Sequence, residues 1–166
     1  MKKTIMLLFI ALMATGLFSQ FKFINEQYAQ KAKNFFTVVQ EEELGVSFLT
    51  FLNGVTFEFA FTLNREMNED YDYSYLAVKV KTPQEKWTLE EEFNQCRQVF
   101  NKVLTRIGLN QLTKQVEKNF TEVFNTQTQG HPNFDIDFTV DGTVLRTRIM
   151  QSDDGLVLGL FEFQRK

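Results

Sequence analysis

Apolar and polar residues alternate along the segment from Val46 to Leu63, and the alternation is centred on Asn53-Gly54. Asn-Gly between two alternating runs is the strongest short signal for a two-residue β-hairpin, because a type I′ turn needs a positive φ at both central residues. The sequence therefore predicts a hairpin with one apolar face. The expected pairing is Leu52 with Val55, Thr50 with Phe57, Phe48 with Phe59 and Val46 with Phe61.

A second hairpin is predicted around Asp141-Gly142, which is another type I′ sequence. The expected pairing is Val140 with Thr143, Phe138 with Leu145, Ile136 with Thr147 and Phe134 with Ile149. On the opposite face the same register places Asp137 beside Arg146 and Asp135 beside Arg148. Such cross-strand pairs of opposite charge stabilise a sheet by roughly 0.2–1 kcal/mol each.

Each hairpin is followed by one more predicted strand, over residues 73–81 and 156–164. Helical spacing of apolar residues predicts three helices, over residues 25–43, 88–107 and 110–125. Thr88 and Glu91 have the spacing of a capping box, and Gly108 follows the last turn of that helix.

The predicted fold class is α+β, with the order α-βββ-αα-βββ and antiparallel sheet packed against helices. The two halves are alike, since each holds an Asn-Gly or Asp-Gly hairpin and a third strand, so the chain is either an internal duplication or two common meanders. The pattern leaves open whether the strands form one six-stranded sheet or two three-stranded sheets.

The first nineteen residues have the composition of a targeting segment. Lys2 and Lys3 precede an apolar run over residues 5–14, and small residues follow it. The segment resembles bacterial secretory signal peptides, which implies a periplasmic or secreted protein whose single domain covers residues 20–166. The alternative is an uncleaved anchor, although the apolar run is short for a span of about 20 residues.

The charge of the chain argues against a role in nucleic-acid binding. The net charge is −3, and removing two of the 18 basic residues with the leader leaves 16 against 21 acidic residues, a net charge of −5. Phosphate backbones are bound by basic surfaces, so we expect no nucleic-acid partner. No other run is long enough to cross a membrane after the leader is removed.

The residues that usually carry chemistry are few. His131 and Cys96 are the only histidine and cysteine. His131 is expected in a surface loop, and Cys96 in the apolar stripe of a helix, where a thiol is buried and inert. The acidic segments beginning at Asn68 and Asp135 lack the glycine and glutamate that an EF-hand loop requires. We therefore predict no catalytic residue, metal site or cofactor.

The remaining candidate is a surface. Tyr71, Tyr73 and Tyr75 alternate, so they share one face of a predicted strand and point away from its apolar side. Leu49 and Phe51 lie on the corresponding face of the first hairpin. Together the five side chains are a candidate binding patch, because exposed aromatic patches often mark binding sites. The simpler interpretation is that the N-terminal helix covers this face.

Three hypotheses for function follow from these patterns. The first is a non-enzymatic interaction module that binds a protein partner. The second is a small-molecule or lipid binder with a cavity lined by some of the chain's 19 phenylalanines. The third, more remote, is a hydrolase that uses two carboxylates. The sequence identifies neither the ligand nor the oligomeric state.

Overall fold

The computed structural model describes residues 21–82 and 84–166, without the side chain of Ser152. The predicted leader, residues 1–19, lies outside the described residues. The elements are α2 (Glu26–Lys33), β1 (Thr37–Glu42), β2 (Gly45–Leu52), β3 (Val55–Glu66), β4 (Tyr71–Val80), α3 (Leu89–Ile107), α4 (Asn110–Thr128), β5 (Ile136–Val140), β6 (Thr143–Ser152) and β7 (Gly155–Arg165). The α+β class and the order of helices and strands are confirmed, with one more strand than predicted before α3.

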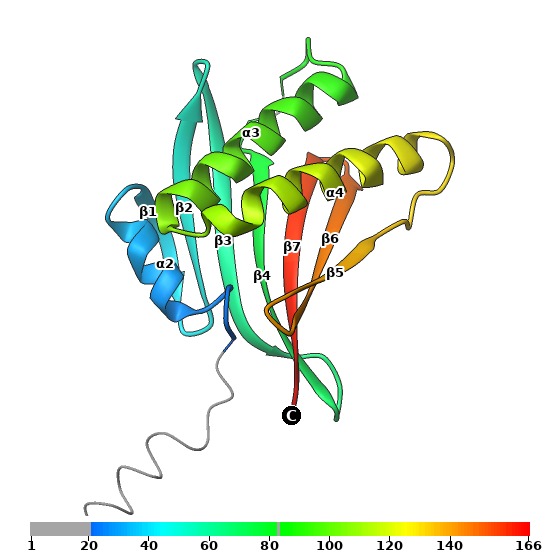
Figure 1. Ribbon diagram of the computed structural model, residues 1–166. Coiled ribbons are helices and arrows are strands. Elements are labelled where there is room, and N and C mark those ends of the chain that lie inside the picture. The colour runs from blue at the N-terminus through cyan, green and yellow to red at the C-terminus, as the bar shows by residue number, and fades with distance from the viewer. Residues whose placement is uncertain (1–20, 83) are drawn as a thin grey trace, which may run out of the picture.

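The strands form one antiparallel seven-stranded sheet in the order β1-β2-β3-β4-β7-β6-β5 (Figure 1). The meanders β2–β3–β4 and β5–β6–β7 join through their last strands, β4 and β7. Of the two arrangements that the sequence left open, the single sheet is the one formed, with β1 added as a seventh strand. Because β4 and β7 are central, residues from the two halves of the chain become neighbours on one surface.

Both hairpin turns have the predicted geometry. The φ angles are 51° at Asn53 and 79° at Gly54, and 48° at Asp141 and 79° at Gly142. The register of β2 with β3 is confirmed at all four predicted pairs. The register of β5 with β6 is confirmed at three pairs, but β5 begins at Ile136, so the predicted pairing of Phe134 with Ile149 is not formed.

The helix predicted over residues 25–43 is too long. Helix α2 ends at Lys33, and residues 37–42 form the edge strand β1 instead. Asn25 caps the helix as predicted, by accepting a hydrogen bond from the N–H of Tyr28 at 3.2 Å. The β-branched residues Thr37, Val38 and Val39 favour an extended backbone, and β2 offers them an unpaired edge.

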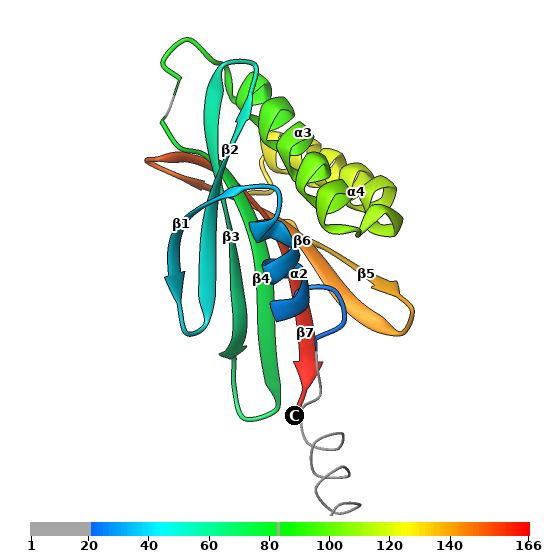
Figure 2. The same cartoon turned by 90° about the vertical axis from the view of Figure 1, so that its left-hand side faces the viewer.

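The helices α2, α3 and α4 all lie on the same side of the sheet (Figure 2). Burial alternates along the strands, as β4 shows: Ser74, Leu76, Val78 and Val80 are buried and the residues between them are half-buried. The capping box of Thr88 and Glu91 is present, and Gly108 ends α3 with a φ of 89°. The core lies between the sheet and these helices, and the phenylalanines of β2 and β3 (Phe48, Phe57, Phe59 and Phe61) are within it.

Candidate functional site

The second face of the sheet has none of the described helices on it. Helix α2 does not cover the tyrosines, because its buried Ala29 and Ala32 belong to the core on the other face. Phe36, which follows α2, packs against the core residue Phe59 with ring centroids 4.8 Å apart. The interpretation that the N-terminal helix covers the tyrosine face is therefore wrong. We call this second side of the sheet the uncovered face.

Four half-buried rings form an aromatic patch at the centre of the uncovered face: Tyr73, Tyr75, Phe161 and Phe163. Tyr75 and Phe161 stack across the β4–β7 pair with centroids 5.1 Å apart. Tyr73 lies 6.1 Å from Tyr75, and Phe163 lies 6.4 Å from Phe161. Ring pairs at these separations stabilise each other beyond the area they bury, so the patch is a preorganised surface.

A glycine beside the patch explains how Phe161 is placed. A Cβ atom added to Gly159 would lie 2.8 Å from Cε2 of Phe161, closer than real Cβ contacts. The ring therefore lies over the backbone of its own strand. Glycine in a strand interior often marks such a close approach, and here it lets the aromatic ring lie along the sheet.

Two arginine–aspartate pairs border the aromatic patch on the side of β5 and β6. Arg146 donates to both carboxylate oxygens of Asp137 at 2.6 and 2.9 Å, and Arg148 donates to Asp135 at 2.6 Å. Both cross-strand charge pairs that the sequence predicts are present. The hydrogen bond from Arg146 lowers the pKa of Asp137 below its usual range, and the same bond raises the pKa of Arg146.

The guanidinium groups also contact the rings. Arg146 lies 5.1 Å from the centroid of Phe163, and Arg148 lies 5.6 Å from that of Phe161. A cation within about 6 Å of a ring face is attracted to it by the ring quadrupole. Each arginine is therefore oriented by a carboxylate on one side and by an aromatic ring on the other.

The structure divides the five residues that the sequence proposed for a binding patch. Tyr73 and Tyr75 belong to the aromatic patch, and Tyr71 lies at its edge with 41% of its surface exposed. Leu49 and Phe51 are on the same face but on β2, with β3 between them and β4, so they do not join the tyrosines. Phe51 is 63% exposed.

Phe161 and Phe163 were missed by the sequence analysis. Their strand is apolar on both faces, so alternation alone did not say which side chains face the core. The sequence signal that existed was their spacing of two, which matches Tyr73 and Tyr75. Only the pairing of β4 with β7 makes these two sets neighbours.

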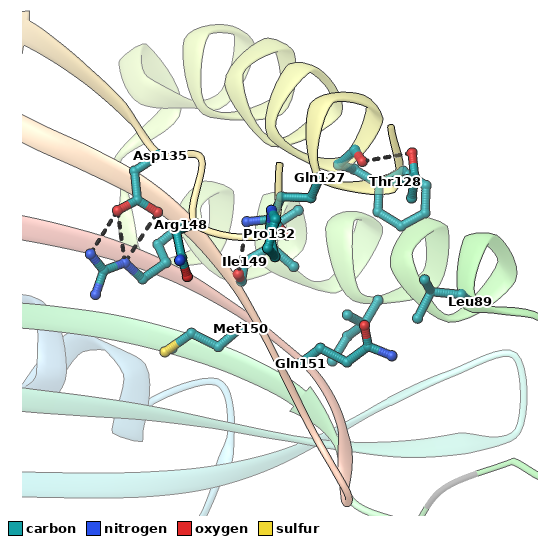
Figure 3. A pocket seen from close by; sticks show the side chains of 12 residues that line it. Leu89, Gln127, Thr128, Pro132, Asp135, Arg148, Ile149, Met150 and Gln151 are labelled. Carbon is teal, nitrogen blue, oxygen red and sulfur yellow. Dashed lines mark hydrogen bonds and ion pairs between the residues drawn. The ribbon is translucent and has the colours of Figure 1, made fainter. Parts of the chain in front are cut away.

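One hollow adjoins this surface, and another lies at the β6 edge of the sheet on its helical side. The first, of about 570 Å³, is lined by Tyr71, Met67, Phe163 and Arg146 among others. The other, of about 580 Å³, lies between β6, the start of α3 and the end of α4 (Figure 3). Neither is lined by the phenylalanines of β2 or β3, which contact one another in the core, as Phe48 and Phe59 do at 4.8 Å.

The other residues considered for chemistry are placed as follows. Cys96 is buried in α3, and its burial raises the pKa of the thiol to about 12. His131 is exposed in the loop after α4. Within the described ranges no group of three or more His, Cys, Asp or Glu side chains is placed to hold a metal ion.

Comparisons with known proteins find no matching family model, curated protein or solved structure. Among the residues that the structure describes, no helix is long and apolar enough to span a membrane.

Proposed function

We propose that this protein is an interaction module that binds a protein partner through the uncovered face of its sheet. The observation that carries the proposal is the aromatic patch, four stacked rings on a sheet face that no described helix covers. Tyrosine, phenylalanine and arginine are enriched in protein interfaces, and tyrosine and arginine are frequent among the residues that dominate binding energy.

The surroundings of the patch support the same function. Tyr71, Met67 and Val144 extend its apolar area, with 41%, 53% and 44% of their surfaces exposed. Because Arg146 and Arg148 are already paired with aspartates, a partner can cover them without leaving an isolated charge in a dry interface. The patch therefore has an apolar centre and a satisfied polar border, as specific interfaces do.

Site-specific photo-crosslinking tests the proposal. A photoreactive amino acid replaces Val144, beside the patch, in the full chain expressed in its native cells. A matched variant carries the same group at Gln111, an exposed residue of α4 on the helical side. We expect a discrete crosslinked species from position 144 and none from position 111.

The variant Phe163→Ser completes the test, since it removes one ring of the patch. We expect it to abolish the crosslink at position 144 while the melting temperature stays high enough for the protein to remain folded. Equal crosslinking from both positions, or a crosslink at 144 that survives Phe163→Ser, contradicts binding through this face.

A further inference from the structure

Strand β6 has an outer edge that is only half paired. Strand β5 pairs with it from Thr143 to Thr147 and no further, whereas β7 pairs with it from Leu145 to Ser152. From Arg148 onward, no strand among the described residues pairs with the side of β6 that faces away from β7. An unpaired strand edge presents backbone N–H and C=O groups that a second extended chain can pair with.

The register shows which backbone groups point outward. Residues 149 and 151 of β6 are opposite Leu158 and Leu156. The N–H of Leu156 donates to Oε1 of Glu92 at 2.8 Å, away from β6, so the Gln151–Leu156 pair is of the non-hydrogen-bonded kind. In such a pair the backbone groups of both residues point away from each other. The N–H and C=O of Gln151 and those of Ile149 therefore face away from β7.

A glutamine side chain takes the place of the missing strand at one of these groups. Nε2 of Gln127, near the end of α4, donates to the carbonyl oxygens of Phe134 and Ile149, both at 3.1 Å. This bridge stands where the sequence predicted that Phe134 would pair with Ile149. The amide of Gln127 carries two N–H groups, so a backbone N–H of an incoming strand can take over the carbonyl of Ile149 while Gln127 keeps its bond to Phe134.

The space next to this edge is the hollow of about 580 Å³. Its apolar lining includes Leu89, Phe124, Ile149 and Leu156. Figure 3 shows Asp135 and Arg148 at one end of the hollow, with Gln151 and Leu89 at the other. Leu89 is 37% exposed although it stands beside buried Leu156. A strand edge and an apolar hollow thus lie side by side.

We propose that this edge binds an extended peptide segment of a partner protein, which adds to β6 as an antiparallel or parallel strand. Backbone hydrogen bonds to Ile149 and Gln151 provide affinity, and alternate side chains provide selectivity, as in other cases of strand addition. One apolar side chain of the peptide enters the hollow against Leu89 and Phe124. The side chains on either side of it face Met150 and the uncovered face. The site is separate from the aromatic patch.

The test uses random linear heptapeptides displayed on phage and selected against the protein expressed from the full chain. The decisive variant is Gln151→Pro, which removes the outward N–H and places the ring of proline in the path of the incoming strand. It breaks no bond between β6 and β7, because that N–H faces away from β7. The matched control is Thr139→Pro on β5. Thr139 and Val144 lie between hydrogen-bonded pairs, so the N–H of Thr139 also faces away from its partner strand β6.

We expect selected peptides to share an apolar residue flanked by β-branched residues and to slow hydrogen exchange at the N–H of Gln151. Gln151→Pro weakens their binding at least tenfold, and Thr139→Pro changes it less than twofold. Should Gln151→Pro fail to fold, Leu89→Lys, an exposed substitution at the start of α3, is the second variant and lowers affinity by a similar factor.

The results that overturn the inference are distinct from those that overturn the proposed function. Failure to enrich any peptide, or equal binding by wild type, Gln151→Pro and Leu89→Lys, refutes an edge site and leaves the aromatic patch untouched. Peptides whose binding is lost in Phe163→Ser but kept in Gln151→Pro bind the uncovered face instead. Self-association of the chain that Gln151→Pro abolishes shows that the edge takes a second copy of this chain.

Discussion

Glu162 is the buried residue whose replacement gives the sharpest test of how this fold is held together. It is on the core face of β7 and is 2% exposed. Its Oε1 accepts the N–H of Lys22 at 2.6 Å, and its Oε2 accepts those of Phe23 at 2.9 Å and Ile24 at 2.7 Å. The carboxylate therefore anchors the first described residues of the chain to the last strand.

The substitution Glu162→Gln keeps the shape and removes the charge. The amide has one oxygen, so its best orientation keeps the two N–H groups of Phe23 and Ile24 and loses that of Lys22. A hydrogen bond to a charged group contributes roughly 1.5–3 kcal/mol, against about 0.5–1.5 for a neutral one. One lost bond, and two bonds that each weaken by about 1–1.5 kcal/mol, therefore lower the free energy of unfolding by about 3.5–6 kcal/mol.

The assay is urea denaturation of residues 20–166 followed by circular dichroism, with hydrogen exchange at residues 22–24 as a local measure. The matched control is Glu43→Gln, an exposed residue of the β1–β2 turn, which we expect to change stability by less than about 0.5 kcal/mol. A loss below about 1 kcal/mol in Glu162→Gln, with exchange at residues 22–24 unchanged, would refute the assignment of Glu162 as the anchor.

Three further predictions concern single residues. Gly155→Ala destabilises the protein by roughly 1–3 kcal/mol in thermal unfolding, because the φ angle is +109° and the new Cβ would collide with the carboxylate of Glu92, which accepts the N–H of Leu156. Asp137 has a lowered pKa, so its contribution to stability is complete above about pH 4 and is lost as the pH falls further. The melting temperature of Asp137→Asn therefore falls less between about pH 5 and pH 2 than that of the wild type. Cys96, with a pKa of about 12, reacts with a thiol reagent at pH 8 only after denaturant is added, and rapid reaction of the native protein would contradict its burial.

The parts of the fold that sequence predicted well are those fixed by neighbouring residues. The turns at Asn53-Gly54 and Asp141-Gly142 set the register of two hairpins, because a two-residue turn leaves only one pairing that buries the apolar face. The capping box at Thr88 and the glycine at residue 108 likewise located α3 within a residue. These features depend on local backbone geometry, which the sequence carries directly.

The errors of the sequence analysis came from contacts between distant segments. Residues 37–42 have apolar spacing that continues that of α2, yet they form a strand because β2 has a free edge for them. The predicted position of α2 was wrong because the spacing of Ala29 and Ala32 does not say which face of the sheet they pack on. Packing beside α3 places them on the core face. The amphipathic pattern of a helix or strand shows which of its sides is buried, but it does not show which other element packs against that side.

The candidate site was half predictable for the same reason. The sequence by itself determined that Tyr73 and Tyr75 share one side of a strand and that Asp137 lies opposite Arg146, since both follow from a period of two along a strand. Tertiary structure alone decided that β4 pairs with β7, which stacks Tyr75 on Phe161. Both arginines reach the rings of β7 because β6 pairs with that strand. Strand pairing across a long connection depends on how the whole core closes, and no local pattern encodes it.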